Sequence, residues 1–185
     1  MINRLRQIWQ RGSATEAAAP GATGVLMICM GNICRSPTAE AVLRSKLQRA
    51  GLAERVWVDS AGTHGYHTGE APDPRAVACG ARRGYDLSRL RARPVHDDDF
   101  LRFDWLLAMD EDNLQWLQRK AVPERRAQLG LLMAHATRHT DELAVPDPYY
   151  GAPAGFERVL DLVEDACDGF VAQLNLTKTV NLVDT

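Results

Sequence analysis

Cys29 and Arg35 are the residues of this chain whose types and spacing most directly predict chemistry. Five residues separate them in the segment CMGNICRS, which spans residues 29–36. A cysteine thiolate is a strong nucleophile, and a guanidinium can bind two oxygens of one phosphoryl group at once. A loop of this length can circle a single tetrahedral phosphoryl group. We therefore predict a phosphate-binding loop in which Cys29 attacks phosphorus and Arg35 holds the oxygens.

The loop between these two residues is expected to bind phosphate through its backbone. Its members, together with the serine that follows Arg35, are Met30, Gly31, Asn32, Ile33, Cys34 and Ser36. Backbone N–H groups that turn inward above a helix N-terminus suit a phosphate dianion and favour the thiolate over the thiol. Gly31 is expected to let the backbone bend tightly. A cysteine at a strand end is more often a small buried apolar residue, but the glycine and the serine favour phosphate binding.

Asp147 is the second candidate for chemistry, because a proline stands on each side of it. Pro146 and Pro148 restrict the backbone around its carboxyl group. A carboxylic acid held in such a loop can donate a proton to a leaving group. On this observation alone an Asp-Pro pair is more often a turn or a helix cap, so both interpretations stay open at this point.

The elements that must position these residues alternate between strand and helix from Gly24 onward. Residues 25–30 form a continuous apolar run, which is typical of a strand buried on both faces. A helix is expected over residues 37–50, and Gly51 ends it. Further strands are expected at 56–58, 103–109 and 128–133, the last with a helical turn as its alternative. Further helices are expected from Pro74, with Asp73 as N-cap, and over 111–120 and 156–174.

This alternation indicates an α/β fold with a parallel sheet and helices on both faces. We expect a three-layer α/β/α domain over residues 24–175, with a mostly four-stranded parallel sheet. The phosphate loop then lies between the first strand and the first helix. Ligands bind at the carboxyl ends of the strands in such sheets, so the fold and the loop predict the same site.

The two ends of the chain carry no pattern that predicts packing. Residues 1–23 are expected to be a flexible leader and residues 176–185 a flexible tail. In the leader, a short apolar stripe leaves contact with a membrane surface or another subunit as an alternative. Its members are Ile2, Leu5, Ile8 and Trp9.

Composition argues against several other function classes. The net charge of −2 gives no electrostatic case for a nucleic-acid partner. The sequence contains no apolar run of about 18 residues, so stable membrane insertion is not expected. The four cysteines lack the paired spacing of a small disulfide scaffold, so a cytoplasmic location is expected. His135 and His139 have helical spacing but no third ligand, so no metal is expected.

Several motifs in order resemble one known family. Residues 25–40, with the sequence VLMICMGNICRSPTAE, resemble the signature of the low-molecular-weight protein tyrosine phosphatases. Further matches are DSAGT at 59–63, PDPRA at 72–76, AMDE at 108–111 and PDPYYG at 146–151. The resemblance runs from Gly24 to Leu174. It implies an enzyme that hydrolyses phosphotyrosine through a phosphocysteine intermediate.

The resemblance assigns catalytic and binding roles to particular residues. It implies that Cys29 is the nucleophile, that Arg35 binds the phosphoryl group and that Asp147 is the general acid. Tyr149 and Tyr66 would form two aromatic walls over a deep anion site. Such walls would accept a phenyl ring and leave the shorter phosphoserine out of reach.

The resemblance also implies a supporting shell around the loop. Asn32 would hold the strained turn of the loop, with Ser60 as its hydrogen-bond partner. Ser36 would donate a hydrogen bond to the nucleophile and stabilise it as a leaving group. Glu40 and Arg75 match an ion pair behind the loop, for which a solvated surface pair is the alternative.

Two further positions carry narrower expectations. Cys34 would form a reversible disulfide with Cys29 that protects the nucleophile from overoxidation, or else be a packing residue. Arg83 stands where some relatives carry a histidine before the glycine, so it is left out of the predicted site.

No cofactor is expected, and the expected partner is a phosphotyrosine protein, with a tyrosine kinase as one candidate. The chain is expected to be a monomer or a weak homodimer. The alternatives are a thiol-dependent arsenate reductase and an inactive phosphotyrosine-binding or redox-sensing module. Arsenate reduction needs a relay of cysteines, whereas Cys79 has no sequence neighbour for one. A silent module would be expected to lose the cysteine, the arginine or the acid, and all three are present.

Overall fold

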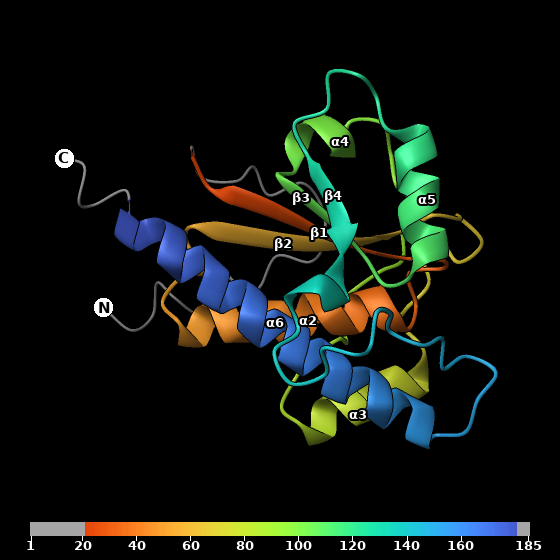
Figure 1. The fold of residues 1–185 in the computed structure, drawn as a ribbon. Coiled ribbons are helices and arrows are strands. Elements are labelled where there is room, and N and C mark those ends of the chain that lie inside the picture. Colours follow the sequence, from red (N-terminus) through yellow and green to blue (C-terminus); the bar gives the residue numbers. More distant parts are fainter. Residues whose placement is uncertain (1–20, 181–185) are drawn as a thin grey trace.

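A parallel sheet of four strands forms the centre of the protein. The structure is a computed structural model that describes residues 21–180, with side chains through Asn175. The strands are β1 (Thr23–Cys29), β2 (Val56–Gly62), β3 (Trp105–Ala108) and β4 (Gln128–Leu131). They pair in the order β2-β1-β3-β4, and all pairs are parallel (Figure 1). The α/β fold with a four-stranded parallel sheet is therefore confirmed.

Helices cover both faces of this sheet. They are α2 (Arg35–Arg49), α3 (Pro74–Arg82), α4 (Asp99–Arg102), α5 (Glu111–Lys120), the 3-10 helix η1 (Leu132–His135) and α6 (Ala154–Val180). Figure 1 shows α2, α3 and α6 below the sheet and α4 and α5 on its other side. The result is three layers.

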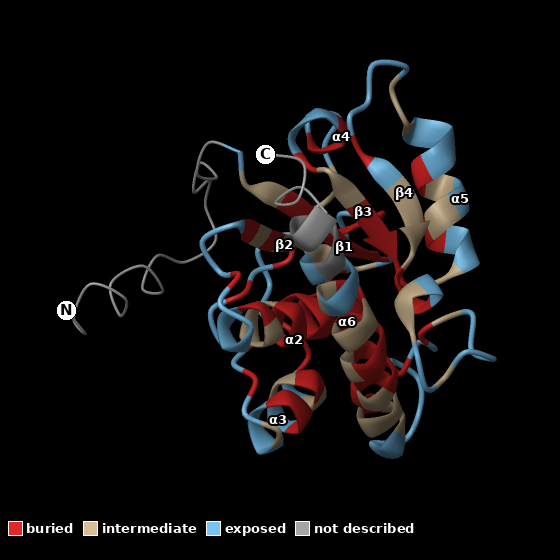
Figure 2. Cartoon of the chain, turned by 60° about the vertical axis from the view of Figure 1, so that its left-hand side comes forward, coloured by how far each residue is buried: buried red, intermediate tan, exposed pale blue. Residues whose placement is uncertain are grey.

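The core is divided by the sheet into two apolar clusters. Val25 and Met27 of β1 face the cluster that includes α2 and α6, whereas Leu26 and Ile28 face Phe100 and the rest of the other cluster. Figure 2 shows the buried residues concentrated in the strands and on the helix faces that meet them. Because both faces of β1 are covered, its sequence is apolar without alternation.

Most predicted elements form, with shifted boundaries. Asp73 caps α3 as predicted, since its side chain accepts a hydrogen bond from the backbone N–H of Arg75. The expected strand at 103–109 is shorter, and the short helix α4 before it was not predicted. The segment expected as a strand over 128–133 divides into β4 and η1. The first helix begins at Arg35 instead of residue 37, which places the guanidinium on its first turn.

The predicted ends of the chain can be compared with the structure only within residues 21–180. Helix α6 continues past Leu174 to Val180, so the flexible tail predicted from residue 176 begins inside a helix. Residues 1–20 and 181–185 lie outside the described residues, and so do most of the leader and its apolar stripe. Within the described part of the chain, no helix combines the length and apolarity that crossing a bilayer requires.

Candidate active site

The phosphate loop lies where three parallel strands end. Cys29 is the last residue of β1 and pairs with Gly62, the last residue of β2. A Cβ atom on Gly62 would lie 2.7 Å from the Met30 carbonyl oxygen and 2.9 Å from that of His64. Only glycine therefore lets the end of β2 lie directly against the loop.

The Cys29 sulfur is buried among hydrogen-bond donors. The residue is only 3% exposed. Its Sγ accepts a hydrogen bond from the backbone N–H of Asn32 at 3.3 Å and lies 3.1 Å from the Ser36 hydroxyl oxygen. Both groups can stabilise a thiolate, so this environment suits a nucleophile that must carry negative charge.

Asn32 holds the turn of the loop. Its φ of 56° is the only positive φ of a non-glycine residue among the described residues. Its side-chain Nδ2 donates to the hydroxyls of Ser36 and Ser60, each at 2.9 Å, and its Oδ1 accepts from the backbone N–H of Arg93 at 2.9 Å. Three anchors therefore stabilise a conformation that costs an L-residue energy.

Gly31 lies in the bend of the loop, as predicted, and it also has a second role. The left-handed residue of the loop is Asn32, and Gly31 is absent from the positive-φ positions. A Cβ atom on Gly31 would lie 3.0 Å from Cδ2 of His67. Gly31 thus makes room for the His67 ring, whose Nδ1 lies 2.7 Å from Glu70 Oε2. This contact between His67 and the loop was not predicted from the sequence.

The predicted ion pair between Glu40 and Arg75 is wrong. Glu40 is buried, accepts a hydrogen bond from the Ser60 hydroxyl and pairs at 2.7 Å with Arg44, one helical turn further along α2. Arg75 instead pairs with Asp73 at 2.8 Å. Burial raises the pKa of Glu40 to about 7, against the opposing effect of Arg44.

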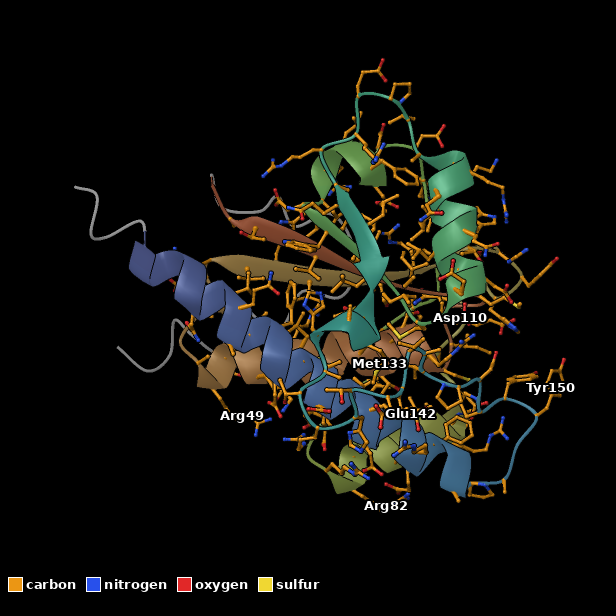
Figure 3. The ribbon with its side chains drawn as sticks, in the orientation of Figure 1. Arg49, Arg82, Asp110, Met133, Glu142 and Tyr150 are labelled. Atoms are coloured by element: carbon orange, nitrogen blue, oxygen red, sulfur yellow. The ribbon has the colours of Figure 1, made fainter. Side chains whose placement is uncertain are left out.

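Arg35 is held between two carboxylates. Its guanidinium forms an ion pair with Asp110 and another, at 3.0 Å, with Asp147 Oδ2, and it donates to the Val145 carbonyl at 3.2 Å. Burial opposes its positive charge, but the sulfur and the carboxylates around it outweigh burial and raise its pKa. Asp110 lies in the AMDE motif, from which no role for it was predicted. Figure 3 shows Asp110 at the start of α5, where it also caps that helix.

Asp147 lies at the open side of the loop. Its side chain is 48% exposed, and its Oδ1 accepts a hydrogen bond from the backbone N–H of Tyr149 at 3.1 Å. Since Arg35 contacts Asp147, the fold brings together the three residues predicted to act as nucleophile, phosphate ligand and acid. The Asp147 carboxylate and the Arg35 guanidinium lie close enough to contact the same bound substrate.

The two predicted aromatic walls stand on loops that adjoin this site. Tyr66 is 77% exposed and stacks on His64, whose backbone N–H donates to the Met30 carbonyl of the phosphate loop at 3.0 Å. Tyr149 follows Asp147 and is partly exposed. Figure 3 shows the neighbouring Tyr150 directed away from the protein. The rings of Tyr66 and Tyr149 are thus accessible to a ligand that enters from solvent.

The remaining residues considered are Cys34, Arg83 and two histidines. Burial, with a smaller effect of Asp73, raises the pKa of the Cys34 thiol to about 12. Arg83 pairs with carboxylates of α6. His135 and His139 contact Gln173 and Asp165 respectively, and the described residues contain no group of three or more potential metal ligands.

Comparison of the sequence with known proteins identifies its family. The family model described as "Low molecular weight phosphotyrosine protein phosphatase" matches residues 24–180. The chain belongs to this family. A low molecular weight protein-tyrosine-phosphatase of Streptomyces coelicolor is 45% identical over 150 residues, which cover 80% of this chain and 91% of the relative. The human low molecular weight phosphotyrosine protein phosphatase is 41% identical over 149 residues, covering 80% and 92%.

Solved structures give the same result for the fold. A protein tyrosine phosphatase from Entamoeba histolytica, crystallised with Hepes in its active site, superposes with a TM-score of 0.81 at 39% identity. The match covers 85% of this chain and 99% of the other. The predicted family, fold and enzyme class, a protein-tyrosine phosphatase and hence a hydrolase, are confirmed. The arsenate-reductase alternative is not favoured, because these relatives are phosphatases.

Proposed function

We propose that this low molecular weight phosphatase hydrolyses phosphotyrosine in proteins by two displacements at phosphorus, with Cys29, Arg35 and Asp147 as its catalytic residues. One observation carries the proposal. A buried sulfur that accepts a backbone hydrogen bond lies in the same loop as an arginine that contacts an exposed carboxylate. This is the arrangement that phosphoryl transfer through a cysteine requires.

In the first displacement the Cys29 thiolate attacks phosphorus, and the bond between phosphorus and the phenolic oxygen breaks. Arg35 and the loop amides hold the three non-bridging oxygens. Asp147 gives its proton to the departing phenolate, so tyrosine leaves as a neutral phenol. A general acid is useful here because a phenolate is a poor leaving group compared with a phenol.

In the second displacement water attacks the phosphocysteine and releases inorganic phosphate. Asp147, now a carboxylate, accepts a proton from that water. The sulfur leaves as a thiolate, and the Ser36 hydroxyl and the Asn32 N–H, which already surround it, stabilise its charge. No cofactor takes part in either step of this proposal.

Substrate choice in this proposal rests on Tyr66 and Tyr149. A phenyl ring between them would bring its phosphoryl group to the depth of Cys29, whereas phosphoserine is too short. Membership of the family implies phosphoprotein substrates, and we propose a tyrosine kinase as one of them. We also propose that the chain works in the cytoplasm, where thiols stay reduced, as a monomer or weak homodimer.

We propose that Cys34 protects the nucleophile. A peroxide would oxidise Cys29 to a sulfenic acid, and condensation with the Cys34 thiol would form a disulfide and release water. The raised pKa of Cys34 predicts that this condensation is slow at neutral pH. Without Cys34, further peroxide would oxidise the sulfenic acid to a sulfinic acid, which thiols do not reduce. Treatment with excess peroxide followed by thiol reduction should therefore restore activity in the native chain and not in Cys34→Ala.

Hydrolysis of para-nitrophenyl phosphate in the presence of EDTA tests the proposed function. We expect the reduced native chain to be active, Cys29→Ser to be inactive and Asp147→Ala to lose roughly a hundredfold or more in kcat. Asp141→Ala is the control, because Asp141 is an exposed aspartate that precedes the acid in the same connection. Absence of phosphate release by the reduced native chain would contradict the proposal.

A further inference from the structure

Arg75, predicted to pair with Glu40, instead links two parts of the active site. It lies on the first turn of α3, and its guanidinium binds the Asp73 carboxylate through two hydrogen bonds of 3.0 and 2.8 Å. The Nη2 atom, which donates the 2.8 Å hydrogen bond to Asp73, also donates to the backbone carbonyl of Tyr149 at 3.0 Å. Tyr149 is two residues from Asp147, so Arg75 contacts the loop that carries the general acid.

The other end of this link is fixed to the phosphate loop. The backbone N–H of Asp73 donates to the carbonyl of Ile33 at 2.8 Å. A continuous set of hydrogen bonds therefore runs from Ile33 through Asp73 and Arg75 to Tyr149. Asp73 is buried, and the hydrogen bonds from Arg75 hold the pKa of its carboxyl below the usual value.

Aromatic rings also contact the Arg75 guanidinium, although the side chain is 40% exposed. Its central carbon lies 4.6 Å from the ring centroid of Phe156 and 5.8 Å from that of Tyr149. Phe156 is buried in the first turn of α6, which lies beside α3 (Figure 1). A guanidinium that stacks on an aromatic ring and forms a forked pair loses little further freedom on binding a third group.

This link has a particular use during the reaction. Without substrate, Asp147 is held by Arg35. We expect Arg35, on binding a phosphoryl group, to turn its donors to the phosphoryl oxygens, which would weaken its contact with Asp147. The contact between Arg75 and Tyr149 does not involve phosphate, so it persists, and with it the hydrogen bond from the Tyr149 N–H to Asp147.

We propose that Arg75 is a positioning residue that keeps Asp147 over the leaving-group oxygen once phosphate has engaged Arg35. The proposal rests on the proposed function, because it gives Asp147 the role of acid. The proposal does not require Arg75 to contact the substrate. It predicts that loss of Arg75 impairs proton donation specifically.

Leaving-group dependence measures proton donation. kcat/KM for aryl phosphates should be compared between phenyl phosphate, whose leaving group needs protonation, and 2,4-dinitrophenyl phosphate, whose leaving group does not. We expect Arg75→Ala to lose about tenfold in kcat/KM for phenyl phosphate and less than about twofold for the dinitrophenyl ester. The inhibition constant of inorganic phosphate should stay unchanged, because the phosphate loop is intact.

Matched variants make the outcome specific. Arg82→Ala removes an arginine from the other end of the same helix, where it pairs with Glu157 (Figure 3), and should behave as the native chain. Arg75→Lys keeps the charge without the fork and should recover only part of the loss. In an Asp147→Ala background, Arg75→Ala should cause no further change in leaving-group dependence.

The ratio of the two kcat/KM values is independent of the fraction of folded enzyme, so partial unfolding of Arg75→Ala does not disturb the test. An equal loss for both esters, or a weaker binding of phosphate, would show that Arg75 is merely structural and overturn the proposal. If Asp147→Ala is impaired and Arg75→Ala matches the native chain, the proposal fails while the proposed function stands. An inactive native chain would instead refute the proposed function.

Discussion

At the scale of single residues, the site depends on polar groups removed from water behind the nucleophile. Glu40, Ser60 and Asn32 form successive hydrogen bonds that end at the turn of the phosphate loop. A buried polar group is stable only if it is satisfied. Each member of this relay is hydrogen-bonded to the next, and the charge of Glu40 is the part that solution pH can change.

Glu40 should make stability depend on pH. Burial raises its folded-state pKa from 4.5 to about 7, so the folded protein binds a proton more tightly than the unfolded chain. The resulting stabilisation is fully present below about pH 4.5 and is lost as the pH rises through about 7. Urea unfolding at pH 5 and pH 8 should show a smaller difference in unfolding free energy for Glu40→Gln than for the native chain. Equal differences in the two proteins would contradict this prediction.

At the scale of elements, the end of β2 supports the phosphate loop through direct backbone contact. We expect Gly62→Ala to displace the loop, because its Cβ atom would lie 2.7 Å from the Met30 carbonyl oxygen. The loss of kcat/KM should exceed about tenfold and be larger than the loss of folded protein explains. Gly130→Ala is the control, since a Cβ atom there meets nothing within 4 Å. Full activity in folded Gly62→Ala would refute this role.

The same scale shows what the sequence could and could not predict. Cys29 and Arg35 were found because one short motif contains both, and the start of helix α3 was found because its cap, Asp73, and the proline that follows are local features. The pair of Glu40 with Arg44 has the i, i+4 spacing of a helix and could have been predicted locally. The hydrogen bond from Ser60 to Glu40 depends on how α2 meets β2, and the contact between Asp110 and Arg35 depends on β3 ending beside β1. Such contacts between distant segments leave no local pattern. Helix α4 has four residues, too few for periodicity to reveal.

At the scale of the whole molecule, α6 covers one face of the sheet and carries a buried carboxylate, Asp165. Asp165 accepts hydrogen bonds from the backbone N–H groups of Thr137, Arg138 and His139. It thereby joins α6 to the connection that follows η1. Burial opposes its ionisation, but these hydrogen bonds outweigh burial and lower its pKa.

Asp165 should therefore contribute to stability without contributing to catalysis. Asp165→Ala leaves three backbone donors without their acceptor, so we expect a loss of about 2–4 kcal/mol in the free energy of unfolding. Because the folded-state pKa is lowered, the native contribution is present above the usual range of an aspartate and is lost as the pH falls. Denaturant unfolding at pH 7 measures the loss, and kcat/KM per folded molecule should be unchanged. Asp168→Ala is the control. Asp168 also lies in α6, but its side chain is 44% exposed, so we expect a much smaller loss in the free energy of unfolding. A fall in kcat/KM at full folding would instead mean that this connection transmits strain to the acid loop further along the chain.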